Sequence, residues 1–170
     1  MNLKDYIRDI PDFPTKGVMF RDITPLLKDP KALQYAESAL LELLGNVQID
    51  KVVGMESRGF FFAPILAAKL NAGFVPVRKP GKLPGSTIRQ DYDLEYGTDA
   101  LEMHSDSIEK GDKVLIHDDV LATGGTANAT CELVERMGGE IVQCNFLLEL
   151  DFLNGKEKLL GYDVKSLIHY

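Results

Sequence analysis

The stretch "VLIHDDVLATGGTA", residues 114–127, decides how this chain is interpreted. It begins as an apolar strand, passes through two adjacent acids, and continues through small residues, threonines and paired glycines into a helical pattern. A glycine-bearing turn that leads into a helix exposes unpaired backbone N–H groups, and threonine hydroxyls add donors, so the turn predicts a phosphate cradle. The acids would repel a phosphate beside them, which indicates that they face ribose hydroxyls or a bound metal ion. The predicted ligand is a ribose 5-phosphate.

Two common phosphate motifs do not describe this turn. The P-loop pattern GxxxxGK[ST] and its lysine are absent. The dinucleotide fingerprint is also absent, because the glycines are adjacent and the acids precede them.

The rest of the chain alternates between strand and helix patterns. Asp29 and Pro30 form an N-cap and first-turn pair, and apolar residues recur at helical spacing until Gly45. The predicted helices are 30–44, 60–70 with Pro64 near its first turn, and 127–137, and the predicted strands are 51–54, 74–77, 113–116 and 140–150. This order predicts an α/β fold with a central parallel sheet and helices on both faces, and ligands bind such sheets at the carboxyl ends of the strands.

One segment interrupts the alternation. Residues 91–104 predict two short strands around Gly97, and residues 78–90 hold four basic residues, no acid and two Pro-Gly pairs. This punctuation predicts a mobile loop rather than a helix or strand. A solvated hairpin is the alternative, because runs of charge usually lie on the surface.

Composition narrows the class of protein. A chain of 170 residues with no internal repeat predicts one domain, long enough to bury about two thirds of its unfolded surface. The net charge of −7 disfavours nucleic-acid binding, and no apolar run is long enough for a membrane. The charged N-terminus lacks the apolar region of a secretory signal, so we expect a cytoplasmic protein. Cys131 and Cys144 are expected to be buried, reduced thiols.

Further segments carry a family resemblance. They are "FPTKGVMFRDITPLLKDP" (13–30), "GMESRGFFFAPILA" (54–67), "RKPGKLPGST" (78–87) and "LEYGTDALEMH" (94–104). Together with residues 114–127, which resemble the phosphoribosyl pyrophosphate (PRPP) signature of the type I phosphoribosyltransferases, they resemble the adenine-specific branch of that family over nearly the whole chain.

The resemblance implies an activity and an architecture. Members transfer the 5-phosphoribosyl group from PRPP to N9 of adenine, giving AMP and pyrophosphate in purine salvage, with Mg²⁺ and as homodimers. The implied fold is a single domain over residues 1–170, with a base-binding N-terminal hood in residues 1–30 and a mobile antiparallel flap in residues 78–104.

The resemblance also implies a PRPP site. The ribose hydroxyls would be held by Asp118 and Asp119, although helix capping or plain surface charge is the alternative for two acids at a strand end. The implied 5′-phosphate residues are Ala122, Thr123, Gly124, Gly125 and Thr126, and the implied pyrophosphate residues are Glu56, Ser57, Arg58, Arg78 and Lys82. A cis peptide before Ser57 is implied as well, and Arg78 would reach the site of a neighbouring subunit. Magnesium would be held mainly by PRPP and pyrophosphate, with no direct ligand from the protein.

The implied catalytic groups are Glu95, Arg58 and Lys82. Glu95 resembles the family's acid/base residue at purine N7, and Tyr96 would help to seal the lid. The implied adenine-binding residues are Met19, Phe20, Arg21 and Val120, although "VMF" (18–20) fits a core segment equally well.

Two positions depart from the family pattern, and two rival functions remain. His117 stands where an apolar residue is usual and is expected to be a hydrogen-bonded core histidine, and Pro80 stands where another basic residue is common. A phosphoribosyltransferase for another 6-substituted purine would use the same PRPP site. A non-catalytic PRPP-sensing regulator is disfavoured because the chain adds no helix-turn-helix and is acidic.

Overall fold

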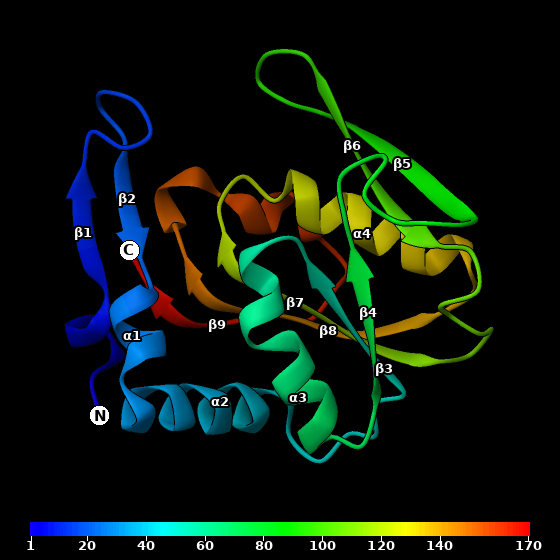
Figure 1. Cartoon of the computed structure of the whole chain (residues 1–170), viewed down its shortest axis with the longest axis horizontal. Coiled ribbons are helices and arrows are strands. Elements are labelled where there is room, and N and C mark those ends of the chain that lie inside the picture. Colours follow the sequence, from blue (N-terminus) through cyan, green and yellow to red (C-terminus); the bar gives the residue numbers. More distant parts are fainter.

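A five-stranded parallel sheet forms the centre of the molecule. A computed structural model describes residues 1–170 (Figure 1). The strands, in spatial order, are β4 (Gly73–Val77), β3 (Lys51–Met55), β7 (Lys113–Leu121), β8 (Glu140–Glu149) and β9 (Val164–His169). The predicted parallel sheet is confirmed, and β9 is a strand that the sequence analysis did not foresee. None of the helices has both the length and the hydropathy of a membrane span.

Helices cover both faces of this sheet, as predicted. On one face lie α2 (Pro30–Leu44) and α3 (Ala63–Lys69), and on the other lies α4 (Gly125–Arg136). Side chains alternate along the strands, so that Val52 packs in the cluster with α2 while Val53 packs in the cluster with α4. Each face therefore buries its own apolar cluster.

Local chemistry fixes the ends of the helices. The Asp29 side chain accepts hydrogen bonds from the N–H groups of Lys31 and Ala32, and Gly45 ends α2 with a φ of 70°. The predicted helix 60–70 is shorter than expected. Residues Arg58–Phe61 form the 3₁₀ helix η2, and α3 begins at Ala63 with Pro64 in its first turn.

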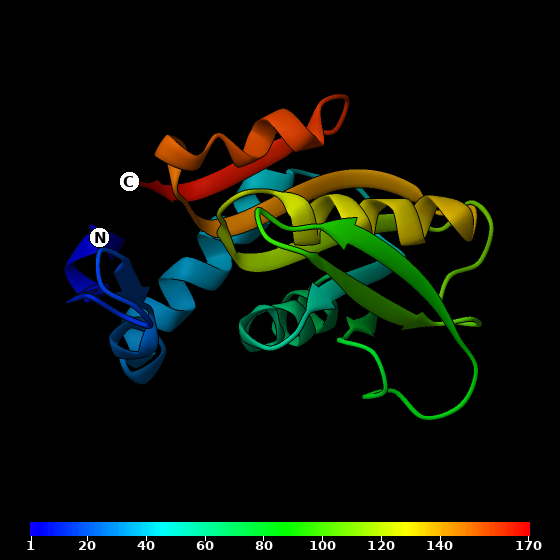
Figure 2. The same cartoon turned by 90° about the horizontal axis from the view of Figure 1, so that it is seen from above.

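Two hairpins project at the carboxyl edge of the sheet (Figures 1 and 2). The first is an N-terminal hood of η1 (Leu3–Tyr6), β1 (Arg8–Pro11), β2 (Met19–Asp22) and α1 (Thr24–Lys28). The second is the flap hairpin of β5 (Thr87–Asp93) and β6 (Thr98–His104). The two strands predicted around Gly97 are confirmed, but β5 begins earlier than expected, at Thr87 inside the expected loop, and residues 94–97 form the turn.

The C-terminal segment packs back on the glycine-rich turn. It contains η3 (Asp151–Leu153) and η4 (Gly155–Leu159), and η4 packs against α4. A Cβ on Gly124 would overlap the carbonyl oxygen of Gly155, and a Cβ on Gly155 would overlap that of Ala122. Only glycines at both positions allow this approach.

The two cysteines lie in the core on the α4 side. Cys131 and Cys144 are free and fully buried, with their sulfur atoms 3.7 Å apart. The hydrogen-bonded thiol of Cys144, together with burial, keeps the pKa of Cys131 well above its usual value. The expected buried thiols are confirmed.

Candidate active site

The chain reverses its direction across the sheet between β3 and β7. From β3 it moves outward to β4, and from β7 it moves the other way to β8 and β9. Ligands of open α/β sheets bind at such a switch point, beyond the carboxyl ends of the strands. Arg58, just after β3, and Asp119, on β7, meet there, with Nε of Arg58 3.0 Å from Oδ2 of Asp119.

The two adjacent acids lie in an environment that resists ionisation. Burial raises the pKa of Asp118 well above its usual value, and the carboxylate of Asp119 adds to this effect. Burial also raises the pKa of Asp119, against the opposing charge of Arg58. Oδ2 of Asp119 is buried and lacks a well-aligned hydrogen-bond donor, although Arg58 stands beside it. A buried carboxylate oxygen without a donor is suited to accept a hydrogen bond from a ligand hydroxyl.

His117 is a core histidine. It is fully buried, its Nδ1 lies 2.8 Å from Oδ1 of Asn145, and its ring meets Phe62 edge to face. Burial lowers its pKa to about 4, against the opposing hydrogen bonds of Asn145. The expected core placement is confirmed, but only one ring nitrogen is hydrogen-bonded, because Nε2 has no partner.

The glycine-rich turn forms a small hollow at the start of α4. Gly124 adopts a left-handed conformation with a φ of 82°, and α4 begins at Gly125. The hollow has a volume of about 70 Å³ and is bordered by Asp118 and Val120 as well as by the turn. Its lining includes all five predicted phosphate residues, Ala122, Thr123, Gly124, Gly125 and Thr126. The structure therefore brings one predicted ribose residue and the predicted phosphate residues together.

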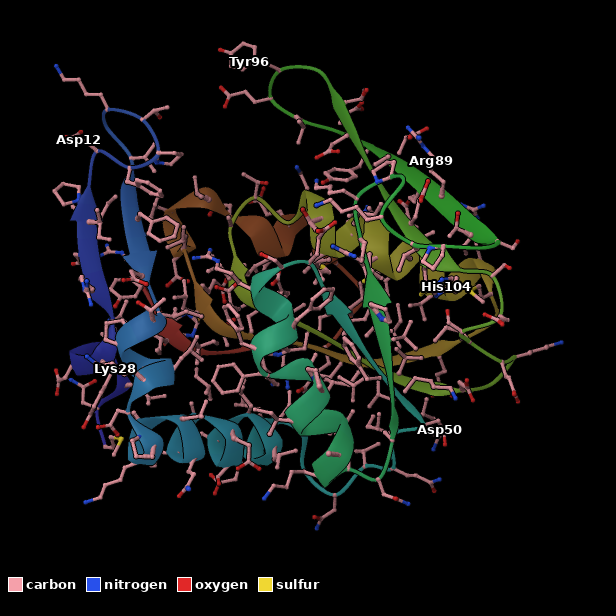
Figure 3. The ribbon with its side chains drawn as sticks, viewed as in Figure 1. Asp12, Lys28, Asp50, Arg89, Tyr96 and His104 are labelled. Atoms are coloured by element: carbon pink, nitrogen blue, oxygen red, sulfur yellow. The ribbon has the colours of Figure 1, made fainter.

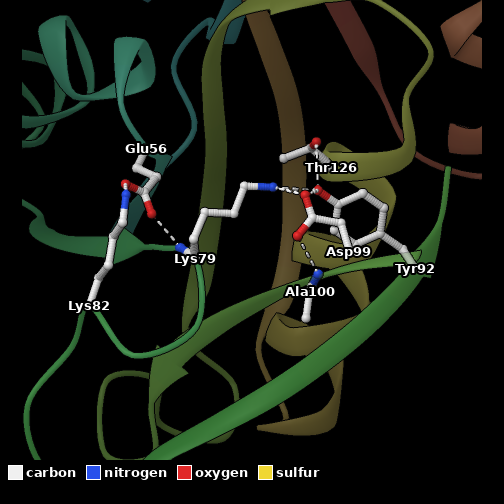
Figure 4. A network of polar contacts seen from close by, with 7 residues as sticks. All are labelled: Glu56, Lys79, Lys82, Tyr92, Asp99, Ala100 and Thr126. Atoms are coloured by element: carbon white, nitrogen blue, oxygen red, sulfur yellow. Dashed lines mark hydrogen bonds and ion pairs between the residues drawn. The ribbon is translucent and has the colours of Figure 1, made fainter. Parts of the chain in front are cut away.

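Glu56 holds the basic loop that precedes the flap hairpin (Figure 4). Its carboxylate is almost buried, contacts Nζ of Lys82 at 2.8 Å and Nη2 of Arg78 at 3.5 Å, and accepts a hydrogen bond from the backbone N–H of Lys79. Burial raises the pKa of Glu56, but these donors outweigh it and hold the pKa below its usual value. The peptide between Glu56 and Ser57 is cis, as the resemblance implied.

The basic residues of 78–90 form ion pairs with acids outside that stretch. Residues 78–90 hold no acid themselves, but folding brings acids to them from other segments. Arg78 and Lys82 pair with Glu56, Lys79 pairs with Asp99, and Arg89 pairs with Asp91.

A polar network joins the flap to the glycine-rich turn (Figure 4). The ammonium of Lys79 donates to the carboxylate of Asp99 and, at 2.9 Å, to the hydroxyl of Tyr92. The same hydroxyl lies 3.4 Å from Oγ1 of Thr126. Sequence reasoning assigned no role to Tyr92 or Asp99. Alternating polarity in 91–104 marked Tyr92 only as a strand residue, and nothing in the sequence pairs it with Thr126.

The tip of the flap faces the turn across a second cavity. This cavity has a volume of about 620 Å³, and its lining includes Glu95, Tyr96, Thr123 and Thr126. Tyr96 is 86 % exposed and extends from the tip of the hairpin (Figure 3). Both flap residues singled out from the sequence thus lie opposite the predicted phosphate residues.

The hood places Phe20 next to Arg58. The guanidinium carbon of Arg58 lies 4.9 Å from the centre of the Phe20 ring, and Phe13 packs edge-on against the same ring at 5.0 Å. Arg58 therefore touches Asp119 on one side and the hood on the other. Met19 is exposed, and Val120 borders the hollow of the turn.

The side chain of Arg21 points away from this region. It pairs with Asp9, and its guanidinium stacks over Tyr170 at 3.9 Å. Only the backbone of Arg21 is therefore left for the predicted base contact. In the two-stranded hood sheet, β2 pairs only with β1, which leaves every second N–H and C=O of β2 without a ladder partner.

One group of side chains has the composition of a metal site. Glu149, Asp151 and His169 bring their ligand atoms within 4.8 Å of one another. The ammonium of Lys156 lies 2.8 Å from Oε2 of Glu149 and neutralises that carboxylate. At the switch point, the oxygen donors are Asp118 and Asp119, which are of the kind that Mg²⁺ prefers.

Comparisons with known proteins agree with this geometry. The sequence pattern of the family described as "Phosphoribosyl transferase domain" matches residues 23–167. An adenine phosphoribosyltransferase of Christiangramia forsetii is 66 % identical over 100 % of this chain and 99 % of its own length.

Solved structures agree as well. An adenine phosphoribosyltransferase of Thermoanaerobacter pseudethanolicus superposes with a TM-score of 0.96 at 52 % identity, covering 99 % of this chain and 98 % of the other. The enzyme of Saccharomyces cerevisiae, in complex with adenine and an imino-altritol bisphosphate, gives 0.91 at 44 % identity, covering 96 % and 95 %.

The parallel sheet, the acid pair at its switch point and the match over 23–167 define a phosphoribosyltransferase. Because the chain is 66 % and 52 % identical to adenine phosphoribosyltransferases over nearly its full length, it belongs to the adenine phosphoribosyltransferase family.

Proposed function

We propose that this chain transfers the 5-phosphoribosyl group of PRPP to N9 of adenine, giving AMP and pyrophosphate. The observation that carries the proposal is the placement of Arg58, which contacts Asp119 of the predicted ribose site and Phe20 of the predicted base site. The two substrates would meet at this residue. The yeast relative was solved in complex with both adenine and an imino-altritol bisphosphate, which supports a base site and a phosphosugar site in one enzyme.

Asp118 and Asp119 would accept hydrogen bonds from the ribose 2′ and 3′ hydroxyls. The 5′-phosphate would lie in the turn of residues 122–126, where backbone N–H groups and the hydroxyls of Thr123 and Thr126 can donate to it. In the reaction, the bond from C1 to the pyrophosphate oxygen breaks and the bond from C1 to N9 forms. The sugar is positively charged in the transition state, and the two nearby carboxylates would stabilise that charge.

Arg58, Lys82 and Arg78 would neutralise the leaving pyrophosphate, and Glu56 and Ser57 would belong to the same pyrophosphate site. The Glu56 carboxylate would serve by keeping these cations near the site until the pyrophosphate competes for them. Magnesium would be held mainly by oxygens of PRPP and pyrophosphate, with no direct ligand from the protein. When bound, it supplies further neutralisation of the pyrophosphate charge.

Adenine would bind as its N7–H tautomer, so that N9 attacks C1 with a free lone pair, and Glu95 would accept the N7 proton as the bond from C1 to N9 forms. Its place on the cavity opposite the turn supports this role once the flap closes. Tyr96 would then cover the site and exclude water from the cationic sugar. Adenine would lie between the hood at Met19, Phe20 and Arg21 and the side chain of Val120.

We further propose a cytoplasmic homodimer. The exposed aromatic side chain of Phe74, on the free edge strand β4, supports a subunit contact there. Two free cysteines are typical of a reducing compartment. Light scattering at several concentrations tests the dimer, and a constant monomer mass would contradict it.

The proposed reaction is tested by incubating the purified protein with PRPP, magnesium and adenine. Chromatography should show equal amounts of AMP and pyrophosphate. Omission of adenine is the control and should abolish pyrophosphate release. A protein that forms no AMP under these conditions would exclude the proposed function.

A further inference from the structure

Lys158 is a cation placed beside the glycine-rich turn by the C-terminal segment. It lies on η4, whose Gly155 packs directly on the backbone of Ala122 and Gly124. The ammonium nitrogen of Lys158 is 3.8 Å from the position that a Cβ on Gly125 would take. The close glycine packing therefore fixes the base of this lysine relative to the first residue of α4.

No acidic side chain neutralises Lys158. On the same segment Lys156 pairs with Glu149 at 2.8 Å, and on β9 Lys165 pairs with Asp163 at 3.4 Å, whereas Lys158 forms no ion pair. Acids line a neighbouring cavity with Lys158, but two of them have other partners: Asp91 pairs with Arg89 and Glu132 accepts from Asn128. The third, Asp93, lies more than 4.0 Å from the ammonium and forms no ion pair with it.

The ammonium faces the same space as the start of α4. Lys158 lines the cavity of about 620 Å³ together with Thr123, Gly125 and Thr126, and it is the only basic residue in that lining. Asp93 and Glu95 line the same cavity, and neither forms an ion pair with Lys158. The first N–H groups of a helix carry partial positive charge. A cation and a helix N-terminus that face one cavity repel each other, and an anion placed between them removes that repulsion.

The turn itself supplies only neutral donors. Its backbone N–H groups and threonine hydroxyls carry no formal charge, and the small hollow that they form has no basic residue in its lining. The chain has a net charge of −7, which repels a dianionic phosphate. A cation close to the site would offset this repulsion and stabilise the bound phosphate.

From this geometry we infer that Lys158 binds the 5′-phosphate of the substrate and of the product AMP. The inference rests on the proposed function, because that function places a 5′-phosphate in the turn. Lys158 would supply the formal positive charge of the phosphate site, while the turn supplies directed hydrogen bonds. The pyrophosphate cations Arg58, Arg78 and Lys82 would not share this role, because none of them lines either cavity.

The test compares ligands with and without the phosphate. Equilibrium binding of AMP and of adenosine is measured for the wild type, Lys158→Met, Lys158→Arg and the matched control Lys165→Met. We expect Lys158→Met to weaken AMP binding by roughly tenfold or more, as for loss of a charge-assisted hydrogen bond, with adenosine binding unchanged. Lys158→Arg should restore most of the AMP affinity, and Lys165→Met should match the wild type.

Two outcomes would overturn the inference. Wild-type affinity of Lys158→Met for AMP would show that the ammonium does not contact the phosphate. An equal loss of AMP and adenosine binding would show that the residue only supports the fold. If thermal unfolding shows that the methionine variant is unstable, Lys158→Gln replaces it in the same measurements. Failure of the proposed function is distinguishable, because the wild type itself would then form no AMP from adenine and PRPP.

Discussion

The hydroxyl of Tyr92 in the flap lies 3.4 Å from Oγ1 of Thr126 in the glycine-rich turn. The same hydroxyl accepts from Lys79, whose backbone N–H donates to Glu56. Lys79 and Tyr92 therefore connect the proposed pyrophosphate site to the proposed phosphate site, and Thr126 is held by the flap before any ligand arrives.

Replacing Tyr92 with phenylalanine removes this contact and keeps the ring. A single hydrogen bond contributes about 1 kcal/mol, so we expect KM for PRPP to rise by roughly fivefold with little change in kcat. Steady-state kinetics measure both constants. Tyr162→Phe is the matched control, because its hydroxyl donates to Glu135 further along the same helix. An unchanged KM for PRPP in Tyr92→Phe would remove Tyr92 from the positioning of Thr126.

The carboxyl pair offers a test of both activity and stability. If Asp118 and Asp119 hold the ribose and stabilise its positive charge, replacing both by asparagine should lower kcat/KM by about 10²-fold or more. Circular dichroism checks that the variant is folded. Near-normal turnover by a folded double variant would place the ribose elsewhere.

The pH dependence of stability gives a second test of Asp118 alone. Its pKa is raised in the folded state, so the folded chain binds its proton more tightly than the unfolded chain does. Stability is therefore lost as pH rises from the ordinary value of 3.8 through the folded pKa. Asp118→Asn cannot ionise, so at pH 7 its Tm should exceed that of the wild type, and the difference should shrink in acid. A lower Tm at neutral pH would contradict this account.

The sheet and the acid pair were predictable from sequence because each depends on neighbouring residues. These signals are local in the sequence. They are the apolar strands, the Asp29 cap and the order of acids, glycines and threonines in 114–127, and each depends on residues only a few positions apart. The parallel sheet then brings the carboxyl ends of β3 and β7 together, so the meeting of Arg58 with Asp119 follows from topology.

Other contacts were not predictable because they join distant segments. Lys158 reaches Gly125 only because two glycines pack backbone against backbone, and Lys79 finds Asp99 only through the register of the flap. The strand β5 begins among glycines and prolines that favour a loop, and it is stabilised by pairing with β6 and by packing of Ile88 and Tyr92 on the α4 core. At this strand, tertiary contacts outweigh the low strand propensity of glycine and proline.

Flap closure is expected to depend on competition between Glu56 and pyrophosphate. In the free protein, Glu56 holds Arg78 and Lys82. PRPP with magnesium should draw these cations to the substrate and slow tryptic cleavage after Lys82 and Arg89. Glu56→Gln should speed cleavage without ligand, because the loop loses its anchor, and should differ less from the wild type with ligand. Equal cleavage of the wild type with and without PRPP would contradict flap closure.

Glu95 is the proposed proton acceptor, and its glutamine variant isolates that role. Glutamine keeps a hydrogen-bonding group but cannot accept the proton, so kcat should fall by roughly 10²–10⁴-fold while PRPP affinity stays near that of the wild type. Pre-steady-state kinetics with binding measurements separate the two effects. Asp93→Asn is the control, because Asp93 lines the same cavity and has no proposed role in the chemistry. A loss of only a few fold in Glu95→Gln would limit Glu95 to positioning.

Base choice should follow from the backbone of β2 in the hood. Adenine presents a donor at its 6-amino group and an acceptor at N1, whereas hypoxanthine presents an acceptor at C6 and a donor at N1. The unpaired edge of β2 offers both a C=O and an N–H from the same residue, which matches the edge of adenine. A backbone C=O can only accept and a backbone N–H can only donate. Hypoxanthine would therefore place its C6 oxygen against the C=O and its N1–H against the N–H, and neither pair can form a hydrogen bond.

A site built on such hydrogen bonds discriminates by about 10⁴–10⁵-fold against a ligand that leaves them unpaired. We therefore expect AMP from adenine and almost no IMP or GMP from hypoxanthine or guanine, measured as ratios of kcat/KM. Arg21→Met separates backbone from side-chain recognition, because the Arg21 guanidinium faces Asp9 and Tyr170 rather than the base-facing edge. The ratio of adenine to hypoxanthine should survive this substitution, and its collapse would move recognition to the side chain. Comparable kcat/KM for the two bases in the wild type would contradict recognition by β2 altogether.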